Sequence, residues 1–76
     1  MKTDERYFLD LCKRELRCPY RGQNSGVFPR DLINSDKLQM NHKRAWYLLC
    51  KCADRGWYEY GTTLDMGWMT EKGMLS

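Results

Sequence analysis

Long apolar runs are lacking from this 76-residue sequence. No segment approaches the roughly 20 consecutive apolar residues of a membrane-spanning helix, and the chain does not open with the charged and apolar regions of a secretory signal. We therefore expect a soluble, cytoplasmic protein that does not enter a membrane. Internal repeats, low-complexity segments and linkers are also lacking, so residues 1–76 are expected to form a single domain.

Motifs of the common enzyme classes are lacking as well. The chain contains one histidine, His42, which any Cys/His or Ser/His pair would have to use. No Gly-x-Ser-x-Gly sequence, Walker motif or paired-carboxylate pattern accompanies it. A chain this short also has little room for an enclosed pocket. The sequence predicts a protein without catalytic activity and without a cofactor.

The four cysteines do not have the spacing of a zinc site. Five residues separate Cys12 from Cys18 and one separates Cys50 from Cys52, whereas zinc knuckles use paired Cys-x2-Cys spacings. Residues two apart on a helix point to different faces, so Cys50 and Cys52 could hardly share a metal ion. Disulfides would require an exported protein. Reduced cysteines that pack in the core are the favoured interpretation, and a metal site that includes His42 or a pair of disulfides are the alternatives.

The composition that remains is globular, with its positive charge in the middle of the chain. Hydrophobic residues make up 42% and charged residues 30%, and three tryptophans, five tyrosines and two phenylalanines can bury large areas. The net charge is +3. Residues 19–56 hold seven basic and three acidic side chains, whereas residues 57–76 hold one basic and three acidic. A negatively charged partner is therefore expected to contact the middle third.

Helical periodicity predicts three helices. The first covers residues 3–17 and ends before Pro19, because a residue that precedes proline avoids helical geometry. Its apolar face comprises Phe8, Leu9, Leu11, Cys12 and Leu16. A short second helix follows Pro29 over residues 30–34. The third covers residues 41–55, with Asn41 as its N-cap and Gly56 as its stop. Its apolar face comprises Ala45, Leu48, Leu49 and Cys52.

Strand-like segments follow the third helix. Residues 57–61 (WYEYG) and 66–70 (MGWMT) are rich in β-favouring residues, and the turn-like residues between them predict an antiparallel hairpin. The apolar pair at 27–28 predicts a further brief strand, and residues 71–76 are interpreted as a tail. The expected fold class is α+β, in the order helix, strand, helix, helix and two hairpin strands.

This order resembles the winged helix-turn-helix superfamily. PRDLI (29–33) is similar to the helix that packs across the recognition helix, and AWYLLCKCADRGWYEYG (45–61) is similar to a recognition helix that leads into the first wing strand. MTEKG (69–73) is similar to the Leu-Thr-Glu-Lys-Gly sequence that follows the wing in many bacterial regulators. The resemblance implies a three-helix winged helix-turn-helix domain with a C-terminal β-hairpin wing, of a small bacterial or phage type.

In that superfamily the N-terminal half of the recognition helix enters the DNA major groove. By position, the resemblance implies that double-stranded DNA contacts Lys37, Gln39, Asn41, His42, Lys43, Arg44, Tyr47 and Lys51. Arginine can pair with guanine, Asn or Gln with adenine, and lysine with phosphate. The expected function is transcriptional regulation or an excisionase-like architectural role, with a homodimer or adjacent copies because one such domain covers little DNA. The alternative for these cations is the solvated face of an amphipathic helix.

The hairpin departs from a DNA-contacting wing. Its connection offers Thr62, Thr63 and Asp65 in place of Lys or Arg, with Glu59 behind them, and a phosphate backbone repels this charge. Its aromatic residues also exceed what two strands easily bury. The alternative function is therefore a protein-binding module or inhibitor of the same fold. Its partner surface would comprise Trp57, Tyr58, Tyr60 and Trp68.

Overall fold

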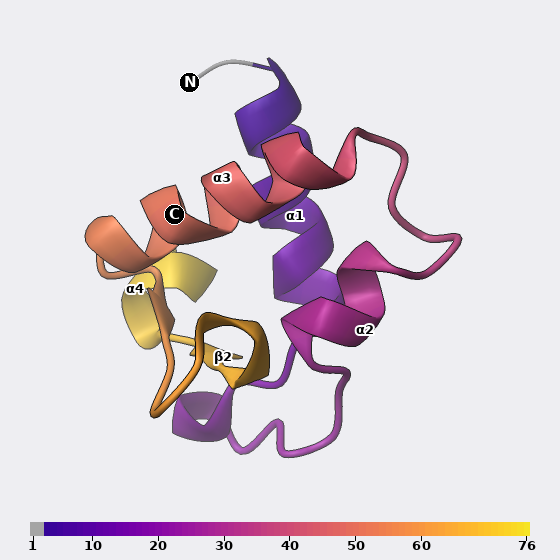
Figure 1. Ribbon diagram of the computed structural model, residues 1–76. Coiled ribbons are helices and arrows are strands. Elements are labelled where there is room, and N and C mark those ends of the chain that lie inside the picture. The colour runs from indigo at the N-terminus through magenta and orange to yellow at the C-terminus, as the bar shows by residue number, and fades with distance from the viewer. Residues whose placement is uncertain (1–2) are drawn as a thin grey trace.

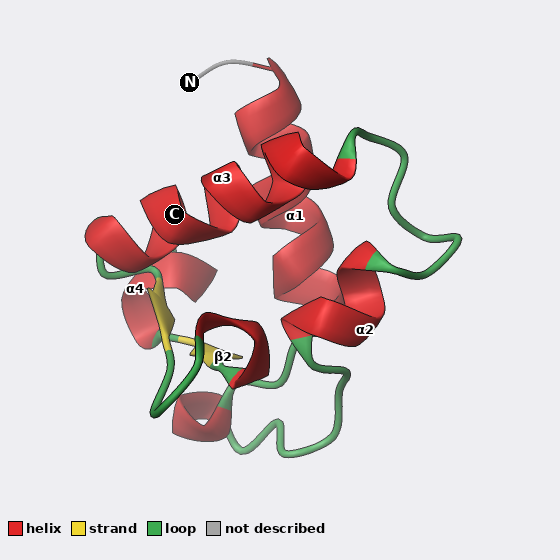
Figure 2. Cartoon of the chain, viewed as in Figure 1, coloured by secondary structure: helices red, strands yellow, loops and turns green. Residues whose placement is uncertain are grey.

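The computed structural model describes residues 3–76 as four α-helices, two single-turn 3-10 helices and one two-stranded sheet. In chain order these are α1 (Thr3–Glu15), η1 (Pro19–Arg21), α2 (Pro29–Ile33), α3 (His42–Asp54), β1 (Tyr58–Glu59), η2 (Leu64–Met66), β2 (Trp68–Met69) and α4 (Glu71–Met74). Helix α3 packs across α1, α2 contacts α3, and β1 follows directly from the C-terminal end of α3 (Figure 1). The expected mixture of helix and antiparallel sheet is present, and the strands are its smaller part (Figure 2).

Helix α1 forms where the sequence predicts it and ends two residues earlier, at Glu15. Leu16 leaves the helix to form a parallel bridge with Val27. The carbonyl of Arg17 then accepts a hydrogen bond of 3.0 Å from the backbone N–H of Met69. All five residues of the predicted apolar face of α1 are buried. The end of α1 is therefore set by backbone pairing with distant segments, which local periodicity does not contain.

Helix α3 also forms as predicted, with local signals at both ends. The side-chain oxygen of Asn41 accepts hydrogen bonds from the backbone N–H groups of Lys43 at 2.8 Å and Arg44 at 3.2 Å. Gly56 follows the last turn at φ 77°, a left-handed conformation that glycine adopts without strain. The predicted core face of α3 is buried at all four positions. Helix α2 starts with Pro29 in its first turn, as predicted.

The hairpin is confirmed, but the strand predicted at 27–28 is wrong. Strands β1 and β2 pair antiparallel, with Tyr58 opposite Met69 and Glu59 opposite Trp68. Val27 makes only the isolated bridge with Leu16, and the next residue, Phe28, already serves as the cap of α2. Because Phe28 already caps α2, only Val27 is left to pair, and a single bridge is too short to form a strand.

The segment interpreted as a tail is instead helix α4, held against the core. Thr70 caps it, because its hydroxyl accepts a hydrogen bond of 3.0 Å from the backbone N–H of Gly73. The same hydroxyl donates to the carbonyl of Gly56 at 2.7 Å, which ties α4 to the end of α3. Gly73 is buried against the backbone of Trp57, where a side chain would not fit. The four-helix order thus corrects the expected three.

One cluster of buried side chains joins α1, α2, α3 and the hairpin. Three of the four cysteines belong to it, namely Cys12, Cys18 and Cys52, whereas Cys50 is exposed, and all four are free thiols. No group of three or more potential ligand side chains in residues 3–76 lies close enough to hold a metal ion. None of the helices in that range combines the length and the apolar character needed to cross a membrane.

Candidate nucleic-acid interface

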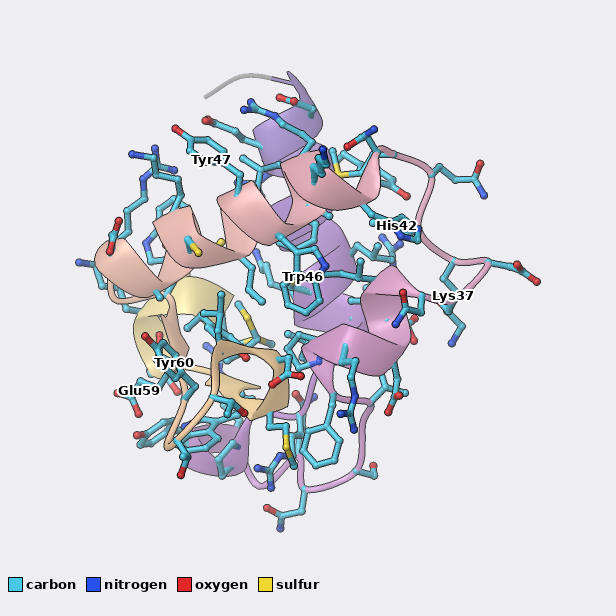
Figure 3. All side chains as sticks on the ribbon, viewed as in Figure 1. Lys37, His42, Trp46, Tyr47, Glu59 and Tyr60 are labelled. Carbon is cyan, nitrogen blue, oxygen red and sulfur yellow. The ribbon has the colours of Figure 1, made fainter. Side chains whose placement is uncertain are left out.

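The first two residues of α3 and the loop before it carry five of the eight residues expected to contact DNA, with Asn41 as the cap between them. His42 and Lys43 form the first turn of α3, and Lys37 and Gln39 lie in the preceding loop; all four are exposed. Figure 3 shows Lys37 and His42 at this same end of the molecule. The aligned peptide dipoles of α3 add partial positive charge here. The arrangement therefore suits contact with an anionic partner.

Helix α1 fixes the loop that presents Lys37 and Gln39. The hydroxyl of Tyr7 donates to the carbonyl of Lys37 at 3.2 Å and accepts from the backbone N–H of Gln39 at 2.8 Å. The ammonium of Lys37 lies 2.7 Å from a carboxylate oxygen of Glu15. Tyr7 and Glu15 were not among the predicted site residues, because both lie at least 22 positions away in sequence. No local pattern marks them.

Arg44 has an internal partner and is not a free guanidinium. Its Nε lies 2.7 Å from a carboxylate oxygen of Asp4 in α1. The hydrogen bond from Arg44 lowers the pKa of Asp4 below its ordinary value, and the same bond raises the pKa of Arg44. Asn41 is also engaged, since its side-chain oxygen caps α3. Arg44 and Asn41, two residues expected to contact bases, thus already make hydrogen bonds within the protein.

Tyr47 and Lys51 lie further along α3, beside Arg44. The Tyr47 ring is 48% exposed, and the cationic groups of Arg44 and Lys51 lie 5.3 and 5.4 Å from its centre. In Figure 3 Tyr47 lies on the side of α3 turned away from His42. The eight predicted residues therefore form two groups, one at the start of α3 with its loop and one along the flank that faces the start of α1.

Lys43 is the least encumbered cation of the first group. Within residues 3–76 it takes part in no ion pair, whereas Lys37 and Arg44 each have a carboxylate within 2.7 Å. Its backbone N–H is held by the Asn41 cap, so the start of α3 fixes where the side chain begins. Lys43 can therefore contact a phosphate without first breaking an ion pair among the described residues, whereas Lys37 and Arg44 cannot.

The hairpin aromatics do not form one exposed patch. Tyr58 is only 2% exposed and its hydroxyl donates to the carbonyl of Leu64, so it belongs to the core and offers no partner surface. Burial raises the pKa of Tyr58 well above the ordinary tyrosine value. Tyr60 is 44% exposed, and Trp57 and Trp68 are half-buried. The guanidinium of Arg55 covers the Trp57 ring at 5.0 Å.

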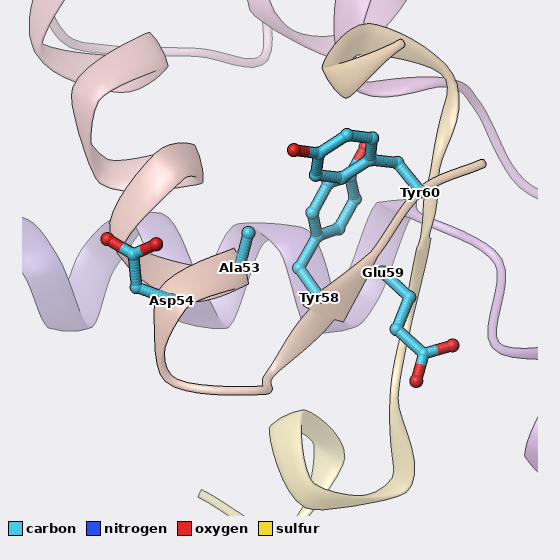
Figure 4. A pocket seen from close by; sticks show the side chains of 5 residues that line it. All are labelled: Ala53, Asp54, Tyr58, Glu59 and Tyr60. Carbon is cyan, nitrogen blue, oxygen red and sulfur yellow. The ribbon is translucent and has the colours of Figure 1, made fainter. Parts of the chain in front are cut away.

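An open hollow lies where the end of α3 meets β1, lined by Ala53, Asp54, Tyr58, Glu59 and Tyr60 (Figure 4). The rings of Tyr58 and Tyr60 stack there with centres 6.2 Å apart. The carboxylate of Glu59 points away from the hollow in Figure 4. It accepts hydrogen bonds on the other face of the strand, from the Tyr20 hydroxyl at 2.7 Å and the Trp68 indole N–H at 3.3 Å. The hollow therefore holds one carboxylate at its rim and no acid–base pair.

Comparisons of the chain with protein-family models, with curated proteins and with solved structures found no match.

Proposed function

We propose that the protein is a small winged helix-turn-helix DNA-binding protein that presents the start of α3 to the major groove. The observation that carries the proposal is the exposed first turn of α3, where His42 and Lys43 stand at a capped helix N-terminus and Lys43 has no internal counter-ion in the described chain. The order of α2, α3 and hairpin resembles that of the superfamily and supports the same proposal. A role in transcription regulation or DNA architecture follows from this class.

Helix α3 has the dimensions for the task. Its 13 residues span about 20 Å at 1.5 Å per residue, and a major groove about 12 Å wide admits one helix. Lys43 and His42 would meet phosphates or base edges, and the Gln39 amide is suited to adenine. Arg44 contributes only after it leaves Asp4. Because so few groups are free, useful affinity requires a homodimer or adjacent copies on the DNA.

The test is a fluorescence-anisotropy titration of labelled duplex DNA at increasing salt. We expect binding at low salt and a steep loss of affinity between 50 and 200 mM salt, as for other phosphate-contacting proteins. Lys43→Ala should weaken binding and reduce the slope of log affinity against log salt by about 0.9, the effect of one phosphate contact. Lys72→Ala is the matched control, because Lys72 is also exposed but lies on α4.

Two outcomes would count against the proposal. Failure of the wild type to bind duplex DNA at low salt would remove it entirely. Equal losses for Lys43→Ala and Lys72→Ala would leave only non-specific attraction between a basic protein and DNA. Circular dichroism of each variant shows whether a loss of binding reflects a loss of fold.

Protein binding by the same fold is the second candidate. The observation that favours it is the exposed aromatic group around Glu59, where Tyr20 is 57% exposed and Trp68 is half-buried. A pull-down in which Trp68→Ala loses a partner that the wild type retains would support this function. Recovery of nucleic acid alone would oppose it.

A further inference from the structure

Arg17, just beyond the end of α1, lies close to two aromatic rings. Its guanidinium carbon is 5.7 Å from the centre of the Phe28 ring and 5.4 Å from the centre of the Trp68 ring. Such stacking is favourable because a planar cation is attracted to aromatic faces. The guanidinium thus lies beside two rings, and its N–H donors are the groups that another polar partner could bond.

The N–H donors of the Arg17 side chain have no hydrogen-bond acceptor within the described chain. The Nε–H of Arg17 is buried without an acceptor, and its terminal nitrogens donate no hydrogen bond to residues 3–76. By contrast, the guanidinium groups of Arg6, Arg21, Arg30 and Arg44 each lie within 4.0 Å of a carboxylate. The buried Nε–H of Arg17 is unfavourable for the isolated fold, because it has lost water and gained no acceptor.

The surroundings of Arg17 are rich in the residue types that dominate protein interfaces. Trp68 and Tyr20 are joined through their hydrogen bonds to Glu59, and Trp, Tyr and Arg are the commonest binding hot spots. In Figure 1 this region, around η1 and β2, lies at the opposite end of α1 from the start of α3. It is thus a separate surface from the proposed DNA contact.

The local charge favours a single carboxylate over a nucleic acid. In the ion pairs Arg21–Glu71 and Arg30–Asp65 a carboxylate already compensates the guanidinium, so neither arginine offers an uncompensated charge to a phosphate backbone. The carboxylate of Glu59, bound to the Trp68 indole, would repel a run of phosphates. The planar edge of one guanidinium, however, matches the two oxygens of one Asp or Glu side chain.

We propose that Arg17, framed by Phe28 and Trp68, anchors a docking surface for a protein partner that inserts an aspartate or glutamate side chain. The carboxylate bonds to the terminal nitrogens of Arg17, and apolar residues on either side of it cover the Trp68 and Tyr20 rings. This surface does not depend on the proposed DNA-binding function, and the two can fail separately.

The experiment uses the full chain against an array of capped peptides, each with one Asp or Glu between apolar residues. A matched array replaces that residue with Asn or Gln. We expect acidic peptides to bind and their amide counterparts not to bind. Arg17→Gln should weaken the best peptide by about 30-fold, the size of an interface hot spot. Arg17→Lys should also weaken it, because lysine keeps the charge but not the planar fork.

Arg55→Gln is the matched control. Arg55 is also stacked on a tryptophan, Trp57, and forms no ion pair with the described residues, but it is exposed and lies at the other end of the hairpin region. Its substitution should leave peptide binding unchanged. In a parallel NMR titration, the Nε–H resonance of Arg17 and the indole N–H of Trp68 should shift with an acidic peptide and not with its amide counterpart.

Three results would overturn the proposal. The first is that no acidic peptide binds better than its amide counterpart. The second is that Arg17→Gln, shown to be folded by circular dichroism, binds as the wild type does; if this variant is unfolded, Arg17→Lys takes its place. The third is that Arg17→Gln weakens duplex DNA binding and leaves peptide binding intact, which would assign Arg17 to phosphate.

Discussion

At the residue scale, adjacent cations in α3 have different freedom. Lys43 has no carboxylate partner in the described chain, whereas Arg44 is held by Asp4 and lies over the Tyr47 ring. The two are next to each other in sequence and both basic, so sequence patterns treat them alike. The difference arises from α1, which brings Asp4 to Arg44 across 40 positions.

This difference leads to a prediction for Asp4→Asn. The amide removes a negative charge beside the proposed interface and frees Arg44 to meet phosphate. DNA affinity at low salt should therefore rise, by up to about fivefold, since only an exposed ion pair is lost. Asp10→Asn is the control: Asp10 pairs with Arg6 on the same helix and forms no ion pair with a proposed DNA-contacting residue. A rise of the same size in both variants would mean that net charge alone is responsible.

The two glycines that flank the hairpin connection provide a second prediction, on stability. An added methyl group at Gly67 would overlap the carbonyl oxygen of Glu59 and the Tyr58 hydroxyl, although its φ of −112° suits any residue. Gly67→Ala should therefore lower the free energy of unfolding by about 1–3 kcal/mol, the usual effect of overpacking. Gly61 has no atom within 4 Å of such a group, so Gly61→Ala should be nearly neutral. Urea unfolding measures both, and a neutral Gly67→Ala would mean that the hairpin closes differently.

At the scale of elements, the sequence predicts what is locally encoded. Periodicity and end signals place α1, α2 and α3 to within two residues, because the N-cap Asn41 and the stop Gly56 act within a few residues of themselves. The strand expected at 27–28 and the tail expected at 71–76 are wrong for the opposite reason. Their structure depends on pairing of Leu16 with Val27 and on burial of Gly73 beneath the hairpin.

The candidate site divides in the same way. Lys43 is exposed because the apolar face of α3 lies on its other side. His42 falls three positions before Ala45, on the side of that apolar face, and is exposed because it is the first residue of the helix. The engagement of Arg44, Lys37 and Tyr58 could not be predicted, because it depends on which distant side chain each one meets. Their roles depend on two carboxylates in α1, Asp4 and Glu15, and on the interior of the hairpin, and the sequence next to each residue carries no signal of these partners.

The cap of α3 can be tested directly. Asn41→Ala removes the acceptor of two backbone N–H groups and should lower the free energy of unfolding by about 0.5–2 kcal/mol. Asn41→Asp should retain most of it, since aspartate caps equally well. Asn24→Ala, in the exposed loop before α2, is the control and should change little. Thermal unfolding distinguishes these cases, and equal midpoints for Asn41→Ala and Asn24→Ala would show that the cap adds no stability.

At the scale of the whole molecule, one small core supports two surfaces. The proposed DNA contact lies at the start of α3 and the proposed docking surface lies around η1 and β2, with α1 between them (Figure 1). Helix α1 contributes to both, through Asp4, Tyr7 and Glu15 at one end and Arg17 beyond the other. Helix α1 thus packs in the core and also positions side chains on both surfaces.

The shared core also predicts how stability depends on pH. Burial raises the pKa of Cys52 to about 11 and that of Cys12 well above the ordinary thiol value. In the unfolded chain these thiols lose their protons near pH 8.5. Because the pKa of each buried thiol is higher in the folded state, the protonated thiol contributes its full stability below about pH 8.5. This contribution is lost as the pH rises towards 11. The free energy of unfolding should therefore fall by about 1.4 kcal/mol per pH unit for each such thiol across this window.

Urea titrations at several pH values between 7 and 10.5 measure this slope, and two cysteine variants identify its source. Cys52→Ala removes one buried thiol, so its stability should fall less steeply with pH than that of the wild type, whatever stability the cavity costs at pH 7. Cys50→Ser should keep the wild-type slope, because Cys50 is exposed in the folded protein. A flat profile for the wild type, or a slope that changes with Cys50 and not with Cys52, would show that these thiols are not buried in the core of the folded protein.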